Sequence, residues 1–186
     1  MDALTGHLLL ASPEIEHGPF WRSVVYVLDH NHEGAVGVII NRPMDADIDD
    51  VLPEWSRWTT TPSCLFEGGP VALDSALAVG VLPDGARTRV PDEGWKAMRG
   101  RVGLVDLDGP MPEPGQFEGL RIFAGYAGWT AGQLEDEIAG GSWLVVPAVD
   151  TDLVTMRPEA LWVDVLRRQD DELRFWATFP GDPTLN

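Results

Sequence analysis

Short runs of apolar residues recur along the chain, and most of them stop at a glycine, a proline or a polar cluster. Runs of this length between turn residues predict buried or half-buried β-strands. The two runs that flank the polar loop at residues 30–34 further predict a hairpin. We expect strands at residues 7–11, 24–28, 35–40, 64–66, 76–82, 102–107, 120–124, 143–146 and 173–179.

Helical patterns are fewer. The acidic stretch at residues 47–55 predicts a short helix, whose length Pro53 limits. Another helix is expected after Pro158, because apolar residues follow it at helical spacing. Many strands with few helices predict an α+β fold with a mixed sheet, and nothing in the pattern divides residues 1–186 into more than one domain.

The charge of the chain limits its partners. It carries 13 basic and 30 acidic residues, a formal net charge of −17. Affinity for DNA or RNA rests largely on Lys and Arg side chains that neutralise phosphates, so direct nucleic-acid binding is not expected. The stretch at residues 87–101 holds several basic residues, but Asp92 and Glu93 lie among them, and we interpret it as solvated surface. With one cysteine, no signal-peptide pattern and no membrane span, a cytoplasmic protein without an intrachain disulfide is expected.

Three turns at the ends of predicted strands form the candidate site: Asn41-Arg42-Pro43, Glu67-Gly68-Gly69-Pro70 and Gly125-Tyr126-Ala127-Gly128-Trp129. The third turn leads into a helix that Thr130 and Gln133 start as a capping box and that Gly140-Gly141 ends. Free N–H groups at a helix start favour an anion, and an arginine supplies a fork for one. We therefore expect a small anionic ligand or a protein partner at a shared pocket. The candidate binding residues are Asn41, Arg42, Gly68, Gly69, Pro70, Gly125, Tyr126, Gly128, Trp129 and Gln133.

A second interpretation of the same glycines stays open. They serve only to let strand and helix pack closely, and Tyr126 and Trp129 then belong to the core. Gly125, Gly128 and Gly132 are spaced by three and four residues, unlike the dinucleotide fingerprint, and no Gly-Lys-Ser/Thr of a P-loop follows. No nucleotide and no other cofactor is therefore predicted.

Other residue types that often carry chemistry have weaker patterns here. His30 and His32, two residues apart and followed by Glu33, have the donor types of a metal site, but no HExxH or CxxC spacing supports one, so no metal is predicted. Ser23 lacks the Gly-x-Ser-x-Gly frame of a nucleophile elbow and is interpreted as a turn or cap residue. Cys64 has apolar neighbours and is expected to be a buried thiol.

The same segments resemble the AlgH/YqgE family of bacterial proteins over nearly the whole chain. The matching residues are Phe20-x-x-Ser23-Val24, His30, Gly34, Gly37, Asn41-Arg42-Pro43, Gly68-Gly69-Pro70-Val71, Phe123-Ala124-Gly125-Tyr126-Ala127-Gly128-Trp129, Gly132-Gln133-Leu134-Glu135 and Ser142-Trp143. The ending Pro180-Gly181-Asp182-Pro183-Thr184-Leu185-Asn186 is similar to the actinobacterial branch.

This resemblance implies a bifurcated mixed β-sheet folded into a pseudo-barrel with flanking helices. It implies no catalytic residue, since members are usually described as uncharacterised proteins or candidate transcriptional regulators. Many members have a histidine shortly after the Gly-Gly-Pro-Val turn, whereas residues 76–80 of this chain contain none.

Two main hypotheses follow. The first is a non-enzymatic regulatory protein that binds its ligand or partner at the three turns and affects transcription indirectly, because its charge disfavours DNA contact. The alternative is a hydrolase or transferase acting on a small anionic metabolite, with His30, Glu67 or Glu137 as the titratable base. A scaffold that acts through its acidic surface remains a third interpretation. The shared-pocket hypothesis requires Arg42, Gly69 and Trp129 to lie together.

Overall fold

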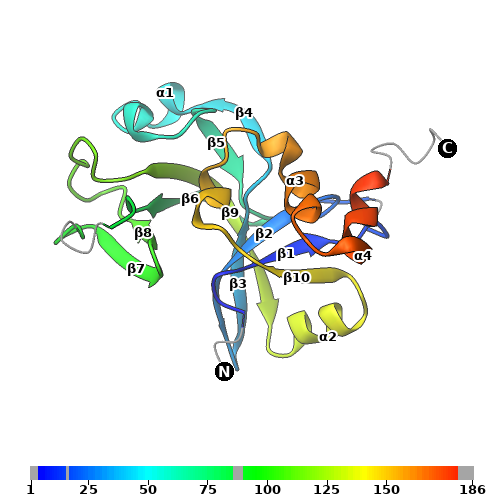
Figure 1. Ribbon diagram of the computed structural model, residues 1–186. Coiled ribbons are helices and arrows are strands. Elements are labelled where there is room, and N and C mark those ends of the chain that lie inside the picture. Colours follow the sequence, from blue (N-terminus) through cyan, green and yellow to red (C-terminus); the bar gives the residue numbers. More distant parts are fainter. Residues whose placement is uncertain (1–3, 16, 86–89, 180–186) are drawn as a thin grey trace.

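The computed structural model describes residues 4–15, 17–85 and 90–179, and its central element is one curled sheet (Figure 1). Its strands are β1 (His7–Ala11), β2 (Val24–Asn31), β3 (Gly34–Ile39), β4 (Pro43–Asp47), β5 (Cys64–Glu67), β6 (Val71–Val81), β7 (Trp95–Arg99), β8 (Val102–Val105), β9 (Gly119–Thr130) and β10 (Trp143–Pro147). The α-helices are α1 (Ile48–Val51), α2 (Gln133–Ala139), α3 (Leu161–Arg167) and α4 (Asp171–Arg174). Short 3₁₀ helices are η1 (Ser56–Trp58), η2 (Asp150–Val154), η3 (Pro158–Ala160) and η4 (Phe175–Thr178).

The sheet branches at one strand. Its main path runs β10-β1-β2-β3-β9-β6-β8-β7, and each neighbouring pair along it is antiparallel. Off this path, β5 lies parallel to β9 and antiparallel to β4. The sheet is therefore mixed and bifurcated, as the family resemblance implied, and it curls between its two ends (Figure 1).

The strand β9 joins the two halves of the sheet because it changes partners along its length. Its first half pairs with β6, as in Ile122 opposite Ala78, and its second half pairs with β3, as in Gly128 opposite Val36. The pairing with β6 ends at Tyr126 and the pairing with β3 begins at Ala127. Just before this change lies Gly125, which has a φ of 70°. A Cβ there would lie 2.6 Å from the carbonyl oxygen of Gly69, so the position accepts only glycine.

The prediction that Gly125 to Trp129 form a turn is therefore wrong. This segment is the second half of a strand, and the positive φ of Gly125 bends β9 without ending it. The capping-box prediction is also only half right, because α2 begins after Gly132 in the left-handed conformation. The side chain of Gln133 does accept a hydrogen bond from the backbone N–H of Thr130 at 3.0 Å.

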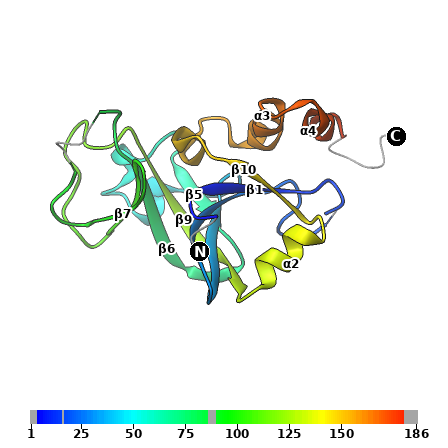
Figure 2. The same ribbon diagram turned by 60° about the horizontal axis from the view of Figure 1, so that its bottom comes forward.

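Helices cover both faces of the part of the sheet formed by β10, β1, β2 and β3 (Figure 2). On one face, Leu8 and Leu10 of β1 share a core with Trp162 of α3. On the other face, Leu9 of β1 lies in a second core with Leu134 of α2. Burial on both sides explains why these strands are continuous apolar runs and why the sequence predicted them well.

Several other boundaries differ from expectation. β2 continues to Asn31, so the hairpin loop shrinks to residues 32–33, and β6 begins at Val71 with six exposed residues. The predicted strand at residues 173–179 is helical instead: Trp176 and Ala177 reach the core, and Phe175 is 69% exposed. β4 and β7 were not predicted. Residues 87 and 89 of the basic stretch and the ending at residues 180–186 lie outside the described part.

Candidate functional site

Two of the three expected segments and the middle of β9 meet where β3, β5 and β9 converge. We call this region the strand junction, formed by Asn41, Arg42, Gly68, Gly69, Pro70, Gly125 and Tyr126. The N–H of Gly68 donates to the carbonyl of Ala124 at 2.9 Å, and the N–H of Glu67 donates to the carbonyl of Arg42 at 2.8 Å. A Cβ on Gly69 would collide with the backbone of Tyr126. These glycines therefore allow direct backbone packing, here of the turn at residues 68–70 against β9 and not of a strand against a helix.

The polar side chains of the strand junction bond to nearby backbone. The amide oxygen of Asn41 accepts from the N–H of Val24, and its nitrogen donates to the carbonyl of Arg22, each at 2.9 Å. Arg42 donates to the carbonyl of Trp21, and burial lowers the pKa of its guanidinium, while nearby Glu67 raises it. Both side chains thus hold the segment before β2 against the end of β3.

Trp129 and Gln133 lie elsewhere, on the face covered by α2. Side chains alternate along β9, so Tyr126 packs toward the core that contains α3, while Trp129 packs toward the core that contains α2. Gly128 is exposed and pairs with Val36 of β3. The structure therefore brings Arg42 and Gly69 to one region and turns Trp129 to the opposite face of the sheet.

A single carboxylate organises the environment of Trp129. The Oε2 atom of Glu137 accepts the indole N–H groups of Trp129 at 2.9 Å and Trp143 at 2.8 Å, and its Oε1 atom accepts from Gln133 at 2.9 Å. Phe20 packs edge-on against Trp143 with ring centroids 5.4 Å apart. We call these five residues the indole–carboxylate cluster. Three donors occupy Glu137, which leaves this residue poorly suited to act as a base.

The other candidate residues also have structural partners. His30 is buried and its Nε2 lies 2.8 Å from the Oε1 atom of Glu135, whose pKa is lowered by a hydrogen bond from its own backbone and then by His30. The hydroxyl of buried Ser23 donates to the carbonyl of Phe20 at 2.8 Å. Among the described residues, His, Cys, Asp and Glu side chains form no group of three or more that fits a metal ion.

A buried arginine, Arg121 of β9, was not anticipated from the sequence. It is 1% exposed and stacks on the ring of Phe66 with 4.2 Å from Cζ to the centroid. Its nitrogens donate to the carbonyls of Thr60, Thr61, Leu153 and Thr155. Burial lowers the pKa of Arg121 to about 10. The only sequence signal was one charged residue within an otherwise apolar strand.

Cys64, expected to be a buried thiol, is half-buried at the start of β5. Burial raises the pKa of this thiol, and a hydrogen bond from the backbone of Met44 and the charge of Arg121 lower it by less. The thiol is thus kept in its protonated form and lacks the low pKa of a reactive nucleophile.

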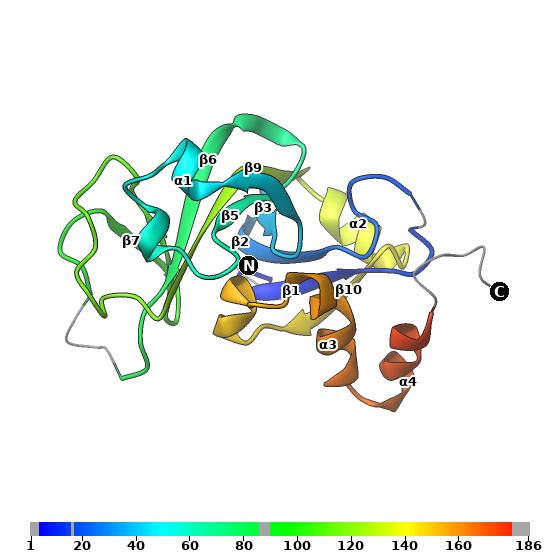
Figure 3. The same ribbon diagram turned by 90° about the horizontal axis from the view of Figure 1, so that it is seen from above.

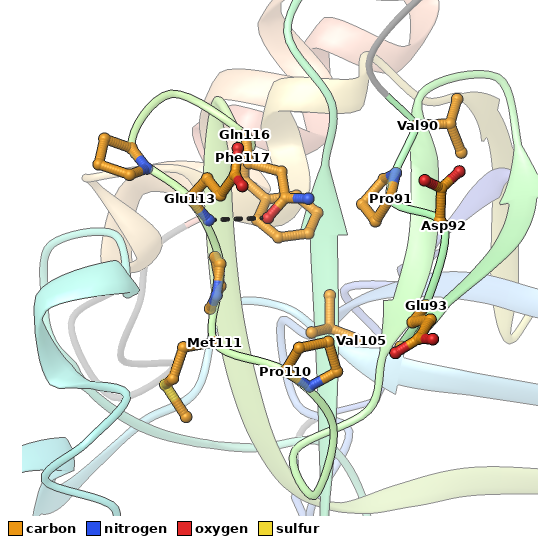
Figure 4. Close-up of a pocket in the computed structure, with 13 residues that line it drawn as sticks. Val90, Pro91, Asp92, Glu93, Val105, Pro110, Met111, Glu113, Gln116 and Phe117 are labelled. Carbon is orange, nitrogen blue, oxygen red and sulfur yellow. Dashed lines mark hydrogen bonds between the residues drawn. The ribbon is translucent and has the colours of Figure 1, made fainter.

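A cavity of about 790 Å³ lies between the loops at residues 90–94 and 110–117 (Figure 4). Three carboxylates lie on it, Asp92 and Glu93 on one side and Glu113 on the other. Its apolar lining comprises Val90, Pro91, Val105, Pro110, Met111, Pro112, Pro114 and Phe117. Gly94 and Gln116 complete the wall.

The floor of this cavity is fixed by aromatic packing. Phe117 packs against Trp95 with ring centroids 5.6 Å apart and the ring planes tilted by 38°. The Trp95 ring lies against Gly80 and Gly103, where a larger residue would clash. The N–H of Glu113 donates to the side chain of Gln116 at 2.9 Å and closes its loop. From the sequence, residues 87–101 were interpreted as solvated surface, and no cavity was expected here. The pair Asp92-Glu93 and the three prolines at residues 110–114 were the available signals.

Comparison with known proteins places this architecture in a family. The model of the AlgH-like family matches residues 8–174. A UPF0301 protein of Streptomyces avermitilis is 48% identical over 187 residues, which cover 100% of this chain and 97% of that protein. Its counterpart in Thermobifida fusca is 46% identical over 194 residues, 99% of this chain and 96% of that protein.

Two solved structures share the fold. The crystal structure of protein DIP2367 from Corynebacterium diphtheriae superposes with a TM-score of 0.85 at 34% identity, covering 95% of this chain and 92% of that one. The solution structure of the AlgH protein from Pseudomonas aeruginosa gives a TM-score of 0.67 at 26% identity, covering 96% and 95%. No helix in the described ranges is long and apolar enough to cross a membrane. Sequence and fold together show that the chain belongs to the AlgH-like family.

Proposed function

We propose that this protein is a non-enzymatic regulatory protein that holds a ligand or a segment of a protein partner in the cavity between residues 90–94 and 110–117. The observation that carries the proposal is the composition of this cavity, which combines a mainly apolar lining that includes Phe117 with three carboxylates. Its volume of about 790 Å³ falls within the range of about 300–1,000 Å³ typical of ligand sites. Any effect on transcription is then indirect, because a net charge of −17 opposes contact with DNA.

The carboxylates of this cavity are available for a ligand. Asp92, Glu93 and Glu113 form no ion pair or side-chain hydrogen bond with any described residue. At the strand junction, in contrast, the side chains of Asn41 and Arg42 already bond to backbone carbonyls. An anionic ligand there would have to displace these contacts, so the geometry supports the cavity better than the expected pocket of turns.

The enzymatic alternative receives less support from the same contacts. A general base needs a free lone pair within hydrogen-bond reach of its substrate. Glu137 accepts three hydrogen bonds and His30 pairs with Glu135. Glu67 lies beside Arg42 at the strand junction. Each of these three candidate bases has its own contacts, and they do not converge on one reacting atom.

Site-specific photo-crosslinking tests the proposal. We expect a benzophenone amino acid placed at Met111, which is 42% exposed on the cavity, to capture a discrete partner or ligand in the native host. The same probe at Val149, which is 50% exposed but outside the cavity, is the matched control. The readout is mass spectrometry of the crosslinked species. An identical crosslinking pattern from both positions, or none from Met111, would refute the cavity as the functional site.

A further inference from the structure

We infer that the cavity binds an organic cation with an alkyl stem, namely an alkyl-ammonium or guanidinium group. This inference rests on the proposed function and specifies the chemistry of its ligand. The described residues that line the cavity include three carboxylates and no lysine, arginine or histidine. A cationic group therefore meets only opposite charge from them, and a chain with a net charge of −17 raises the local concentration of cations further.

The placement of the carboxylates favours an organic cation over a metal ion. A divalent ion needs several oxygen ligands within about 2.0–2.6 Å of one point. Asp92 and Glu93 come from one side of the cavity and Glu113 from the other (Figure 4), and the described acidic residues form no group compatible with a metal. Separated carboxylates instead suit a ligand that carries charge at more than one point, or a planar guanidinium with several donors.

The apolar part of the lining fits the stem of such a ligand. Phe117, Val105 and Met111 contribute apolar surface to the same lining as the carboxylates. Methylene groups gain about 0.8 kcal/mol each when they leave water for such a surface. An aromatic ring face also attracts a cation through its quadrupole. A compact, fully hydrated inorganic cation would bury no apolar surface against this lining. A methylene chain with charged ends can contact both its apolar side chains and its carboxylates.

Contacts within the protein hold the loops that line the cavity in place without a ligand. Four prolines line the cavity and restrict its backbone, at positions 91, 110, 112 and 114. The contact between the Phe117 and Trp95 rings and the hydrogen bond between Glu113 and Gln116 hold the 110–117 loop. Preorganisation lowers the conformational entropy lost on binding, so a small cation can be bound without a large interface.

Isothermal titration calorimetry with defined probes tests the inference. Spermidine represents a free polyamine, and an acetylated peptide containing one Arg and one Lys represents the side chains of a partner. We expect at least one probe to bind with a Kd in the micromolar range and several-fold more weakly at high salt. The combined variant Asp92→Asn, Glu93→Gln and Glu113→Gln should weaken binding at least tenfold.

The matched control is a variant with the same change in net charge elsewhere: Asp74→Asn, Glu33→Gln and Glu159→Gln, all exposed residues outside the cavity. It should bind like the parent protein. Binding of spermidine alone supports a free polyamine, and binding of the peptide alone supports a partner side chain. Absence of binding by both probes, or equal losses in the two variants, overturns the inference. A crosslink from Met111 alongside that result would leave the proposed function standing with a different ligand.

Discussion

Replacement of Arg121 by alanine is expected to lower the free energy of unfolding by about 3–5 kcal/mol. The change removes the stacking on Phe66 and leaves four backbone carbonyls, two of them in the segment after η1 and two around η2, without their donor. It also leaves a void in a position that is 1% exposed. Urea unfolding followed by far-UV circular dichroism measures the loss.

Two further variants keep this prediction open to refutation. Arg121→Lys retains the charge but has neither the planar fork nor as many donors, so we expect an intermediate loss of about 2 kcal/mol. Arg167→Ala removes an exposed arginine at the end of α3 and should change stability by no more than about 0.5 kcal/mol. If Arg121→Ala unfolds at the same urea concentration as Arg167→Ala, the buried guanidinium does not hold these segments together.

Replacement of Glu137 by alanine is expected to cost about 2–3 kcal/mol and to change the tryptophan fluorescence. Two indole N–H groups, from Trp129 and Trp143, lose their shared acceptor in a nearly buried setting. Gln133 loses its partner as well. Because α2 packs on the sheet through this cluster, the loss should loosen the helix as a unit. Chemical unfolding and the emission maximum provide the two measurements.

A neighbouring acidic residue on the same helix supplies the control. Asp136→Ala removes an exposed carboxylate of the first turn of α2 and should cost only a few tenths of a kcal/mol. Glu137→Gln retains one acceptor oxygen and should fall between the two. Wild-type stability and emission in Glu137→Ala would contradict a structural role for this carboxylate and would reopen its assignment as a base.

The parts of the fold that the sequence predicted well share a physical property. Strands β1 and β10 are covered by the cores on both sides, so their apolar runs are long and clearly bounded. β4 and β7 were missed because they are mostly exposed and carry polar or charged residues, as Lys96 and Arg99 do in β7. The local pattern of apolar and polar residues indicates which strands are buried. An exposed strand forms because of the strand it pairs with, which the local pattern does not indicate.

The candidate site was harder to predict for a different reason. The glycines at 68, 69 and 125 were correctly marked as unusual, but their neighbours in space are backbone atoms and not a ligand. The neighbouring residues in the sequence do not distinguish a glycine that lets another strand approach closely from a glycine that lets a phosphate approach closely. The cavity depends on how residues 110–117 fold back toward residues 90–94, a relation set by the floor of Trp95 and Phe117.

The bend of β9 at Gly125 has a consequence for synthesis of the chain. β3 and β6 are both complete by residue 81, yet the strand that pairs with both begins only at Gly119. A growing chain that has not yet reached residues 119–130 therefore carries two open strand edges, which are templates for pairing with other chains. Figure 3 shows β9 running alongside both strands. The last third of the protein thus has to emerge from the ribosome before its first two thirds can fold, and truncation before β9 should yield aggregation-prone fragments.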